Sequence, residues 1–218
     1  MNFAFYTTGK SGRVSKFIQQ APQSVLDSIK IIISDAEIPD DSKRLYGQAG
    51  ISHVQFDRKK FNHLTPRERN TLFSDFMLEA LKQNQVDYCF SFGSHILCGD
   101  LLEEYKNRLI NFHPAILPMF PGTKAIDQAL VHGNVLLVGN TAHFIDAGID
   151  TGSIIMQSVI PLHHFLSHGN DYNVVLDLQI TMLNKLFDVI NNKRLVINDG
   201  VVEIKDADYS QAHIYPCV

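Results

Sequence analysis

The sequence predicts an α/β fold in which helices flank a mostly parallel β-sheet. Apolar, strand-like runs alternate with helical stretches along the chain, which is the pattern of right-handed strand–helix–strand crossovers. The run from Ser28 to Ser34, SIKIIIS, is apolar almost throughout, as expected for a strand that is buried on both faces. A chain of 218 residues fits one domain, or one domain with a small appendage.

The first half of the chain contains five expected strands, with helices between them. The third of these helices opens on Thr65-Pro66-Arg67-Glu68, which is a capping box with proline at the first helical position. The preceding helix ends at Gly50, a residue type that favours helix termini. We expect strands at 3–7, 28–34, 53–56, 87–92 and 108–112, and helices at about 14–20, 41–50, 66–84 and 99–106.

The second half has a different pattern, with strands that follow one another directly. A helix at 125–132 is stopped by Gly133, and two strand-like runs at 136–145 and 154–161 form an expected pair. A long amphipathic helix is expected at 171–191. Asp199-Gly200 lies between short apolar runs at 195–198 and 201–205, which is the signature of a β-hairpin.

Composition excludes several classes of function. The formal net charge is −4 and no basic run occurs, so we expect no nucleic-acid partner. No apolar stretch has membrane-spanning length, and the N-terminus lacks the pattern of a signal peptide. Three cysteines, none in a CxxC pair, suit a reducing cytoplasm and predict neither a disulfide framework nor a zinc site. The expected localisation is therefore cytoplasmic, with no membrane partner.

The segment from 111 to 152 carries the strongest functional signal. Asn111 and His113 are two residues apart at the end of an apolar strand, so their side chains share one face. Asp150 lies in an Asp-x-Gly-x-Asp-x-Gly loop at 146–152. An amide donor, an imidazole and a carboxylate suffice to polarise a carbonyl, bind an oxyanion and move a proton. These residue types predict acyl transfer without a covalent enzyme nucleophile.

Together these motifs resemble the folate-dependent formyltransferase family. The resemblance rests on Asn111-Phe112-His113-Pro114, Leu117-Pro118, Gly122, His143 and Ile149-Asp150-Thr151-Gly152, in that order. It implies a single formyltransferase domain over residues 1–218. A Rossmann-like, nucleotide-binding-like half would span about 1–110, and a folate and catalytic half with antiparallel strands about 111–218. The implied reaction moves a formyl group from 10-formyltetrahydrofolate to a primary amine, with no metal, and the first candidate acceptor is glycinamide ribonucleotide of purine synthesis.

The resemblance also implies roles for the catalytic residues. Asn111 would donate a hydrogen bond to the formyl oxygen, and His113 would stabilise the oxyanion. Asp150 would hold His113 or an ordered water and relay a proton. His143 would support this site, although an ordinary strand histidine is an equal alternative.

Three further segments are implied to bind the substrates. One wall of the pterin site would be Gly93, Ser94, His95, Ile96 and Leu97, and the other Ile145, Asp146, Ala147, Gly148 and Ile149. The amine substrate's phosphate would bind a glycine-bearing first loop with two cations, at Gly9, Lys10, Ser11, Gly12 and Arg13. On the long helix, Gln179 aligns where the family offers a glutamate to the amine substrate.

Two departures from the family leave the acceptor open. Ser11-Gly12-Arg13 replaces the usual Gly-Ser-Asn or Gly-Thr-Asn, and Gln179 replaces the glutamate. They favour another phosphorylated amine, such as a nucleotide-linked amino sugar, as the alternative acceptor. A formyl-folate hydrolase or a folate-binding relative also remains open, as does the choice between monomer and homodimer. We expect the histidines at 163, 164 and 168 to lie in a polar loop rather than at a metal site.

Overall fold

The computed structural model of the protein describes residues 1–169 and 171–210, and it divides into two compact units. Unit 1 comprises Met1–Phe112 together with His143–Gly152. Unit 2 comprises His113–Ala142 and the described residues from Ser153 onward. The C-terminal segment 212–218, to which the sequence assigns no role, lies outside the described residues.

The strands confirm the predicted α/β class. Their hydrogen-bonded order is β3-β2-β1-β4-β5-β6-β7, and β8 and β9 form a separate antiparallel pair. The pairs β1–β2, β1–β4, β2–β3 and β4–β5 are all parallel, so the sheet is mostly parallel as predicted. The bounds are β1 Phe3–Thr7, β2 Ile29–Ser34, β3 Ser52–Gln55, β4 Tyr88–Phe92, β5 Leu109–His113, β6 Leu137–Phe144, β7 Ile154–Pro161, β8 Leu195–Asn198 and β9 Val201–Ile204.

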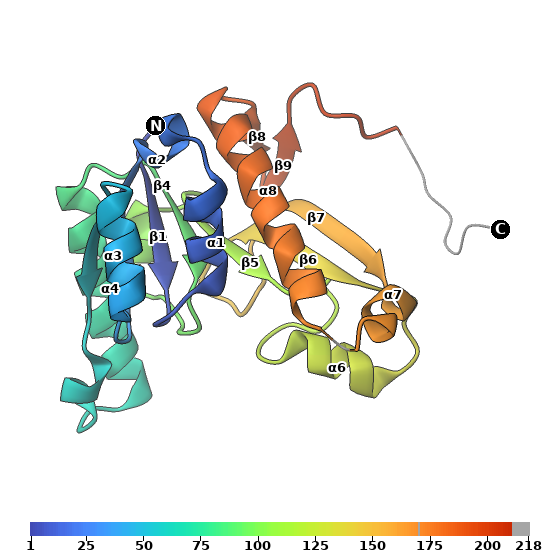
Figure 1. Cartoon of the computed structure of the whole chain (residues 1–218), viewed down its shortest axis with the longest axis horizontal. Helices are drawn as coiled ribbons and strands as arrows, with labels where there is room; N and C mark the ends of the chain where they lie inside the picture. The colour runs from blue at the N-terminus through green and yellow to red at the C-terminus, as the bar shows by residue number, and fades with distance from the viewer. Residues whose placement is uncertain (170, 211–218) are drawn as a thin grey trace. The chain divides into compact units, whose positions relative to one another are not determined.

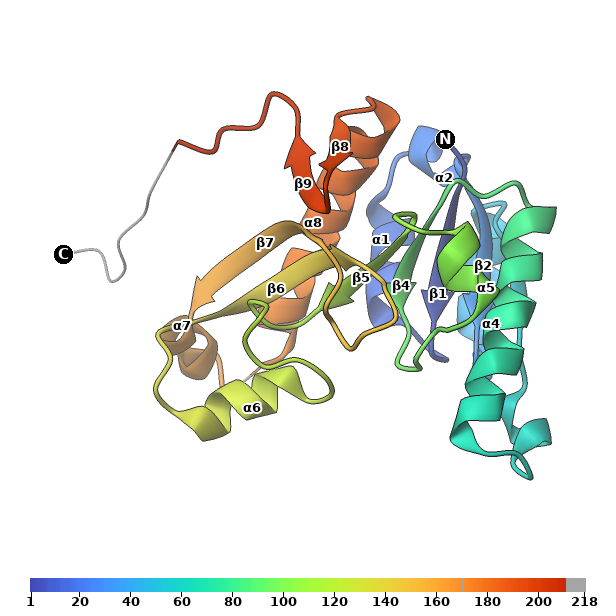
Figure 2. The same ribbon diagram turned by 180° about the vertical axis from the view of Figure 1, so that it is seen from behind.

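Helices cover both faces of the unit 1 sheet. Figure 1 shows α1 (Gly12–Gln20) and α3 (Asp40–Gln48) in front of the strands, and Figure 2 shows α4 (Pro66–Gln83) and α5 (Asp100–Glu104) on the opposite face. Residues of β1 alternate between these two layers. The Phe5 ring meets Phe17 of α1 with ring centroids 5.6 Å apart, while the Tyr6 ring meets Phe73 of α4 at 5.0 Å. This double cover explains why the strands read as continuous apolar runs.

The helix boundaries follow the sequence signals closely. Thr65 and Glu68 form both hydrogen bonds of the predicted capping box, and Pro66 begins α4. Two short elements, α2 (Gln23–Leu26) and the 3-10 helix η1 (Arg58–Phe61), have no expected counterpart. Both are four residues long, which is too short for an apolar periodicity to appear in the sequence.

Unit 2 contains α6 (Ala125–His132), α7 (Leu162–Ser167) and α8 (Asn173–Asn191). It also contains most of β6, all of β7 and the β8–β9 hairpin. Helix α6 ends at Gly133 in a left-handed conformation, as predicted. The hairpin turn is also confirmed, because Asp199 and Gly200 both have positive φ angles of 48° and 80°. The apolar core of this unit includes Ile126, Ala129, Val138, Phe165 and Val175.

The polar loop expected around the histidines at 163, 164 and 168 is a wrong prediction, because residues 162–167 form α7. Leu162 and Phe165 lie three residues apart, and both pack into the unit 2 core. That spacing places the two apolar side chains on one face of a helix, which stabilises it in spite of the polar residues. In the described part of the chain, no helix has both the length and the apolar character needed to cross a membrane.

Candidate active site

Three of the predicted site residues come together within unit 1. Asn111 lies on β5, His143 near the end of β6, and Asp150 in the loop that follows. The Asn111 Nδ2 atom is 3.2 Å from His143 Nε2 and 3.5 Å from Asp150 Oδ1. His143 Nε2 is also 3.5 Å from Asp150 Oδ1, with the His143 side chain 3% exposed and that of Asp150 13% exposed. An amide, an imidazole and a carboxylate therefore form one largely buried cluster.

The hydrogen-bond partners of His143 fix the direction of each donor. Its Nδ1 atom is 2.8 Å from the backbone carbonyl oxygen of Phe144, which only accepts hydrogen bonds, so Nδ1 carries the proton. In the neutral ring, Nε2 is then an acceptor and receives one hydrogen of the Asn111 amide. The other hydrogen of Asn111 Nδ2 donates to Asp150 Oδ1 in a long contact of 3.5 Å. His143 thus orients the amide of Asn111.

The loop that carries Asp150 has a constrained backbone. Asp150 has a φ of 54°, in the left-handed region that aspartate tolerates better than most residues. A Cβ atom on Gly152 would lie 1.8 Å from the carbonyl oxygen of Phe144, so glycine is required there. Asp146 Oδ1 accepts hydrogen bonds from Gly148 N and Thr151 Oγ1, at 3.0 and 2.8 Å. These contacts hold the Asp150 carboxylate in a fixed place.

His113 is the last residue of β5 and the first residue of unit 2. It is buried, and its Nε2 atom lies 2.8 Å from the backbone carbonyl oxygen of Phe120. Since that carbonyl accepts, Nε2 carries a hydrogen in this contact. His113 belongs to a different unit from Asn111, His143 and Asp150, so its predicted catalytic role stays a prediction.

The two segments predicted to hold a pterin both lie in unit 1. Leu97 is a buried member of an apolar cluster, and Ile145 packs against the same cluster. Segments 93–97 and 145–149 are therefore anchored on one apolar core. Ile96 and Ile149, in contrast, are 55% and 59% exposed. Exposed large aliphatic side chains offer apolar surface to a ligand.

In the first loop, Lys10 and Arg13, the two cations predicted to bind a phosphate, both contact other groups of the protein. Lys10 Nζ forms an exposed ion pair with Asp41 at 3.1 Å. Arg13 is partly buried over the Phe92 ring, with its guanidinium carbon 4.9 Å from the ring centroid, and burial lowers its pKa to about 10. Ser11 caps α1 by accepting a hydrogen bond from Val14 N at 3.4 Å. The anion-favouring terminus of α1 is therefore present, and phosphate binding by this loop stays a prediction.

Gln179 lies inside unit 2, on the buried face of α8. Its Nε2 atom donates to Asn140 Oδ1 at 2.8 Å, and Asn140 Nδ2 in turn donates to the carbonyl oxygen of Val175. This interior network accounts for a polar side chain in an apolar helix face. Its predicted contact with the amine substrate stays a prediction.

Sequence reasoning missed a second polar cluster in unit 1. Tyr6, Asp35 and His95 are joined by hydrogen bonds at the carboxyl ends of β1, β2 and β4. The available signal was Asp35, a charged residue directly after the buried strand β2, where ligands bind in open α/β sheets. Within residues 1–169 and 171–210, no group of three or more His, Cys, Asp or Glu side chains is arranged to hold a metal ion.

Comparison with known proteins identifies the chain's relatives. Residues 1–185 match the family described as Formyl transferase. The chain is 40% identical over 96 residues to phosphoribosylglycinamide formyltransferase of Bacillus subtilis, an alignment that covers 44% of this chain and 49% of the relative. It is 35% identical over 146 residues to formyltetrahydrofolate deformylase of Haemophilus influenzae, covering 66% of this chain and 51% of the relative. The chain thus spans about half the length of these curated relatives.

A solved structure is similar over nearly the whole chain. The crystal structure of glycinamide ribonucleotide transformylase 1 from Symbiobacterium toebii superimposes with a TM-score of 0.77 and 25% identity. The superposition covers 94% of this chain and 93% of that chain. The fold and the order of the elements are therefore shared along the length of both proteins.

Proposed function

We propose a reaction for this chain, which belongs to the formyl transferase family. It transfers a formyl group from 10-formyltetrahydrofolate to the primary amine of a small phosphorylated substrate. The first candidate for that substrate is glycinamide ribonucleotide, on which the Bacillus subtilis and Symbiobacterium relatives act by name. The observation that carries the proposal is the cluster of Asn111, His143 and Asp150 within 3.5 Å of one another.

The cluster supplies the groups that formyl transfer needs. When a free amine attacks the formyl carbon, the carbonyl oxygen becomes an oxyanion and the attacking nitrogen becomes an ammonium. The Asn111 hydrogen that makes the long 3.5 Å contact with Asp150 Oδ1 turns to this oxyanion instead, while His143 keeps the amide in place. Asp150 takes a proton from the ammonium. As the oxyanion collapses back to a carbonyl, the bond between the formyl carbon and the folate nitrogen breaks, and that leaving nitrogen receives the proton from Asp150. Removing one oxyanion donor typically lowers kcat about 100- to 1000-fold.

The other predicted segments complete the substrate sites in this proposal. The exposed Ile96 and Ile149 contact the flat faces of the pterin, and backbone groups of 93–97 and 145–149 pair with its polar edge. The start of α1 receives the phosphate of the amine substrate, because a helix N-terminus favours an anion. His113 adds to oxyanion stabilisation. We extend the proposal to a reducing cytoplasm, since Cys89 and Cys98 are free thiols.

The direct test is formyl transfer measured by folate absorbance with the purified protein. 10-Formyltetrahydrofolate is supplied with glycinamide ribonucleotide as acceptor, and with a nucleotide-linked amino sugar in a parallel reaction. We expect amine-dependent release of tetrahydrofolate with the first acceptor. Turnover only with the second would assign the alternative acceptor. Folate turnover that is independent of any amine would contradict transfer.

One observation favours a second candidate, hydrolysis of 10-formyltetrahydrofolate. The Haemophilus influenzae relative is a deformylase by name and aligns with 66% of this chain. Asp150 is partly exposed, so the same carboxylate serves equally well to deprotonate a water. Formate release in the absence of any amine distinguishes hydrolysis, because transfer retains the formyl carbon on the acceptor.

A further inference from the structure

The side chains of Tyr6, Asp35 and His95 take no part in the transfer steps proposed above, although His95 belongs to the 93–97 segment that is proposed to bind the pterin. The Tyr6 hydroxyl donates to Asp35 Oδ2 at 2.5 Å, and His95 Nδ1 contacts the same oxygen. The backbone N–H of His95 donates to the Tyr6 hydroxyl oxygen at 3.4 Å. His95 is therefore held both by its main chain and by its ring.

The buried carboxylate at the centre of this cluster is costly to maintain. The Asp35 side chain is 0% exposed, and its Oδ1 atom has no hydrogen-bond partner among the described residues. A buried polar atom without a partner destabilises a fold, and an isolated buried charge does so more strongly. Native structures keep few such atoms, and those that persist call for a reason beyond folding.

The position of the cluster points to a ligand. His95 belongs to the loop after β4, whose neighbour Ser94 is tied to Thr8 in the loop after β1 at 3.0 and 3.1 Å. His95 therefore stands where the first loop and the 93–97 loop meet, at the carboxyl ends of parallel strands. Its side chain is 36% exposed, so its outer edge is accessible.

The chemistry of the ring defines what it recognises. Because Asp35 Oδ2 only accepts, the hydrogen between it and His95 lies on Nδ1, and the neutral ring presents Nε2 as an acceptor. A carboxylate behind an imidazole fixes its tautomer and makes the outer nitrogen a stronger acceptor. A negative charge at the Nδ1 side of the ring further disfavours an anionic ligand group at Nε2 and favours an N–H or O–H donor.

Gly93 shows that this arrangement is built into the backbone. A Cβ atom at Gly93 would lie 2.0 Å from the Tyr6 ring, so only glycine lets the ring pass directly beneath the loop. The Tyr6 ring is in turn fixed against Phe73. The loop that carries His95 is thus seated on the residue that also anchors Asp35.

We propose that His95 is a specificity-determining residue that accepts a hydrogen bond through Nε2 from an amino or hydroxyl group of a substrate, and that Asp35 is the positioning residue that orients it. This inference rests on the proposed function, which supplies two sources of such a donor. One is the amino group of the pterin in 10-formyltetrahydrofolate, and the other is a hydroxyl or amine of the acceptor substrate.

The test measures binding of each substrate alone by calorimetry, with variants that separate the two nitrogens of His95. His95→Asn keeps an N–H that reaches Asp35 but removes the outer nitrogen, so the fold is preserved while the contact is lost. We expect Kd to rise about three- to tenfold for one substrate, as for loss of a single neutral hydrogen bond, and to stay unchanged for the other. The substrate that weakens identifies the donor. His63→Asn, at an exposed histidine, is the matched control.

Nitrogen-15 NMR of His95 supplies a readout that loss of packing would not imitate. The wild-type ring is expected to be protonated on Nδ1 and unprotonated on Nε2, and Asp35→Asn is expected to change that tautomer and weaken binding of the same substrate. Unchanged binding of both substrates in a folded His95→Asn variant, or a wild-type ring protonated on Nε2, overturns the inference. Absence of wild-type binding to either substrate overturns the proposed function as well, while the NMR result still reports on Asp35.

Discussion

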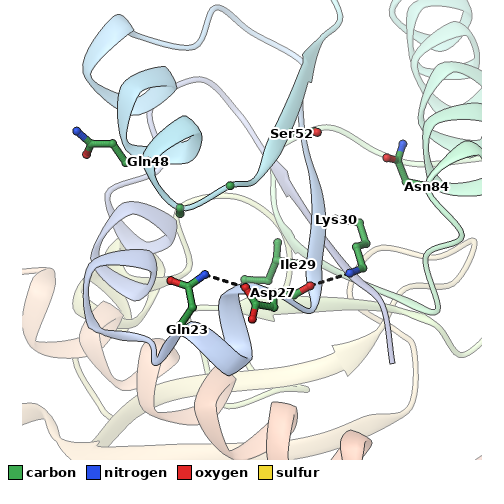
Figure 3. A pocket seen from close by; sticks show the side chains of 9 residues that line it. Gln23, Asp27, Ile29, Lys30, Gln48, Ser52 and Asn84 are labelled. Atoms are coloured by element: carbon green, nitrogen blue, oxygen red, sulfur yellow. Dashed lines mark hydrogen bonds between the residues drawn. The ribbon is translucent and has the colours of Figure 1, made fainter.

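At the amino edge of the unit 1 sheet, the loops before β2 and β3 surround an open hollow of about 520 Å³, which Figure 3 shows. Two hydrogen bonds join residues of its lining: Asp27 accepts from Gln23 Nε2 on its carboxylate at 2.8 Å and from Lys30 Nζ on its backbone oxygen at 2.7 Å. At the carboxyl ends of the same parallel strands the Asp35 side chain is fully buried, and in the loop after β6 the Asp150 side chain is 13% exposed. The hollow thus offers space lined mostly by surface residues, whereas Asp35 and Asp150 are carboxylates largely removed from solvent, and only the latter two belong to the sites that we propose.

The largest expected effect is on kcat, and it compares Asp150 of the proposed site with Asp27 of the hollow. Asp150→Asn keeps the shape of the side chain but removes its ability to accept a proton, so kcat should fall about 100- to 10,000-fold. Asp27→Asn, at the amino edge, should leave kcat within about twofold, as expected for a surface group that no proposed step uses. Both are measured in the formyl-transfer assay, with circular dichroism to confirm folding. A similar fall in kcat for both variants would contradict the view that the proposed site, and not the hollow, carries the reaction.

The second effect compares two glycines by stability. Gly93→Ala forces a Cβ atom into the Tyr6 ring, and overpacking of this kind typically lowers the free energy of unfolding by about 1–3 kcal/mol. Gly47, in α3 close to the hollow, has no atom within 4 Å of an added Cβ, so Gly47→Ala should raise that free energy by about 0.5–1 kcal/mol. Urea unfolding of both variants measures the difference. A stable Gly93→Ala protein would contradict the close approach.

A third effect concerns the pH dependence of stability. Burial, with the nearby Asp35 charge, raises the pKa of Tyr6 far above its usual value, so its hydroxyl stays neutral in the folded protein. A raised pKa contributes stability that is fully present below the unfolded value of about 10 and is lost as pH rises beyond it. Tyr6→Phe should be less stable by about 1–3 kcal/mol at neutral pH, because Asp35 loses a donor. The gap from wild type should narrow above pH 10 in urea unfolding, and a constant gap would refute the Tyr6 contribution.

The smallest expected effect lies at the amino edge. Lys30→Ala removes an exposed contact with the backbone oxygen of Asp27, and surface changes of this kind usually alter the free energy of unfolding by less than about 0.5 kcal/mol. Thermal and urea unfolding, together with KM for both substrates, check this. If Lys30→Ala lowered activity, the hollow in Figure 3 would take part in substrate binding or catalysis, contrary to our expectation.

Structural features that depend on a few consecutive residues were predictable from the sequence. The capping box at Thr65, the Asp199-Gly200 turn and the continuous apolar run of β2 each depend on a few neighbouring residues. Asn111 and Asp150 were singled out by motif order, and the structure places Asn111 beside His143 within unit 1. What a motif cannot provide is the direction of each hydrogen bond, which depends here on the carbonyl of Phe144.

Contacts between distant segments were not predictable. Tyr6, Asp35 and His95 lie on three separate parallel segments, and the register of β1 with β2 and β4 brings them together. No periodicity reports that register, because strands buried on both faces lack the alternation that would fix it. Helix α7 was missed for the opposite reason, since its polar residues concealed two apolar residues at helical spacing.

The discontinuity of unit 1 has a consequence for how the protein is made. Its residues 143–152, which contain His143 and Asp150, rejoin the unit only after the chain has passed through thirty residues of unit 2, His113–Ala142. A ribosome therefore exposes the complete β1–β4 scaffold well before it delivers the groups that face Asn111. The nascent chain therefore completes β1–β4 before residues 143–152 are made, and a fragment that ends at Phe112 would lack His143 and Asp150, two of the three groups of the proposed site.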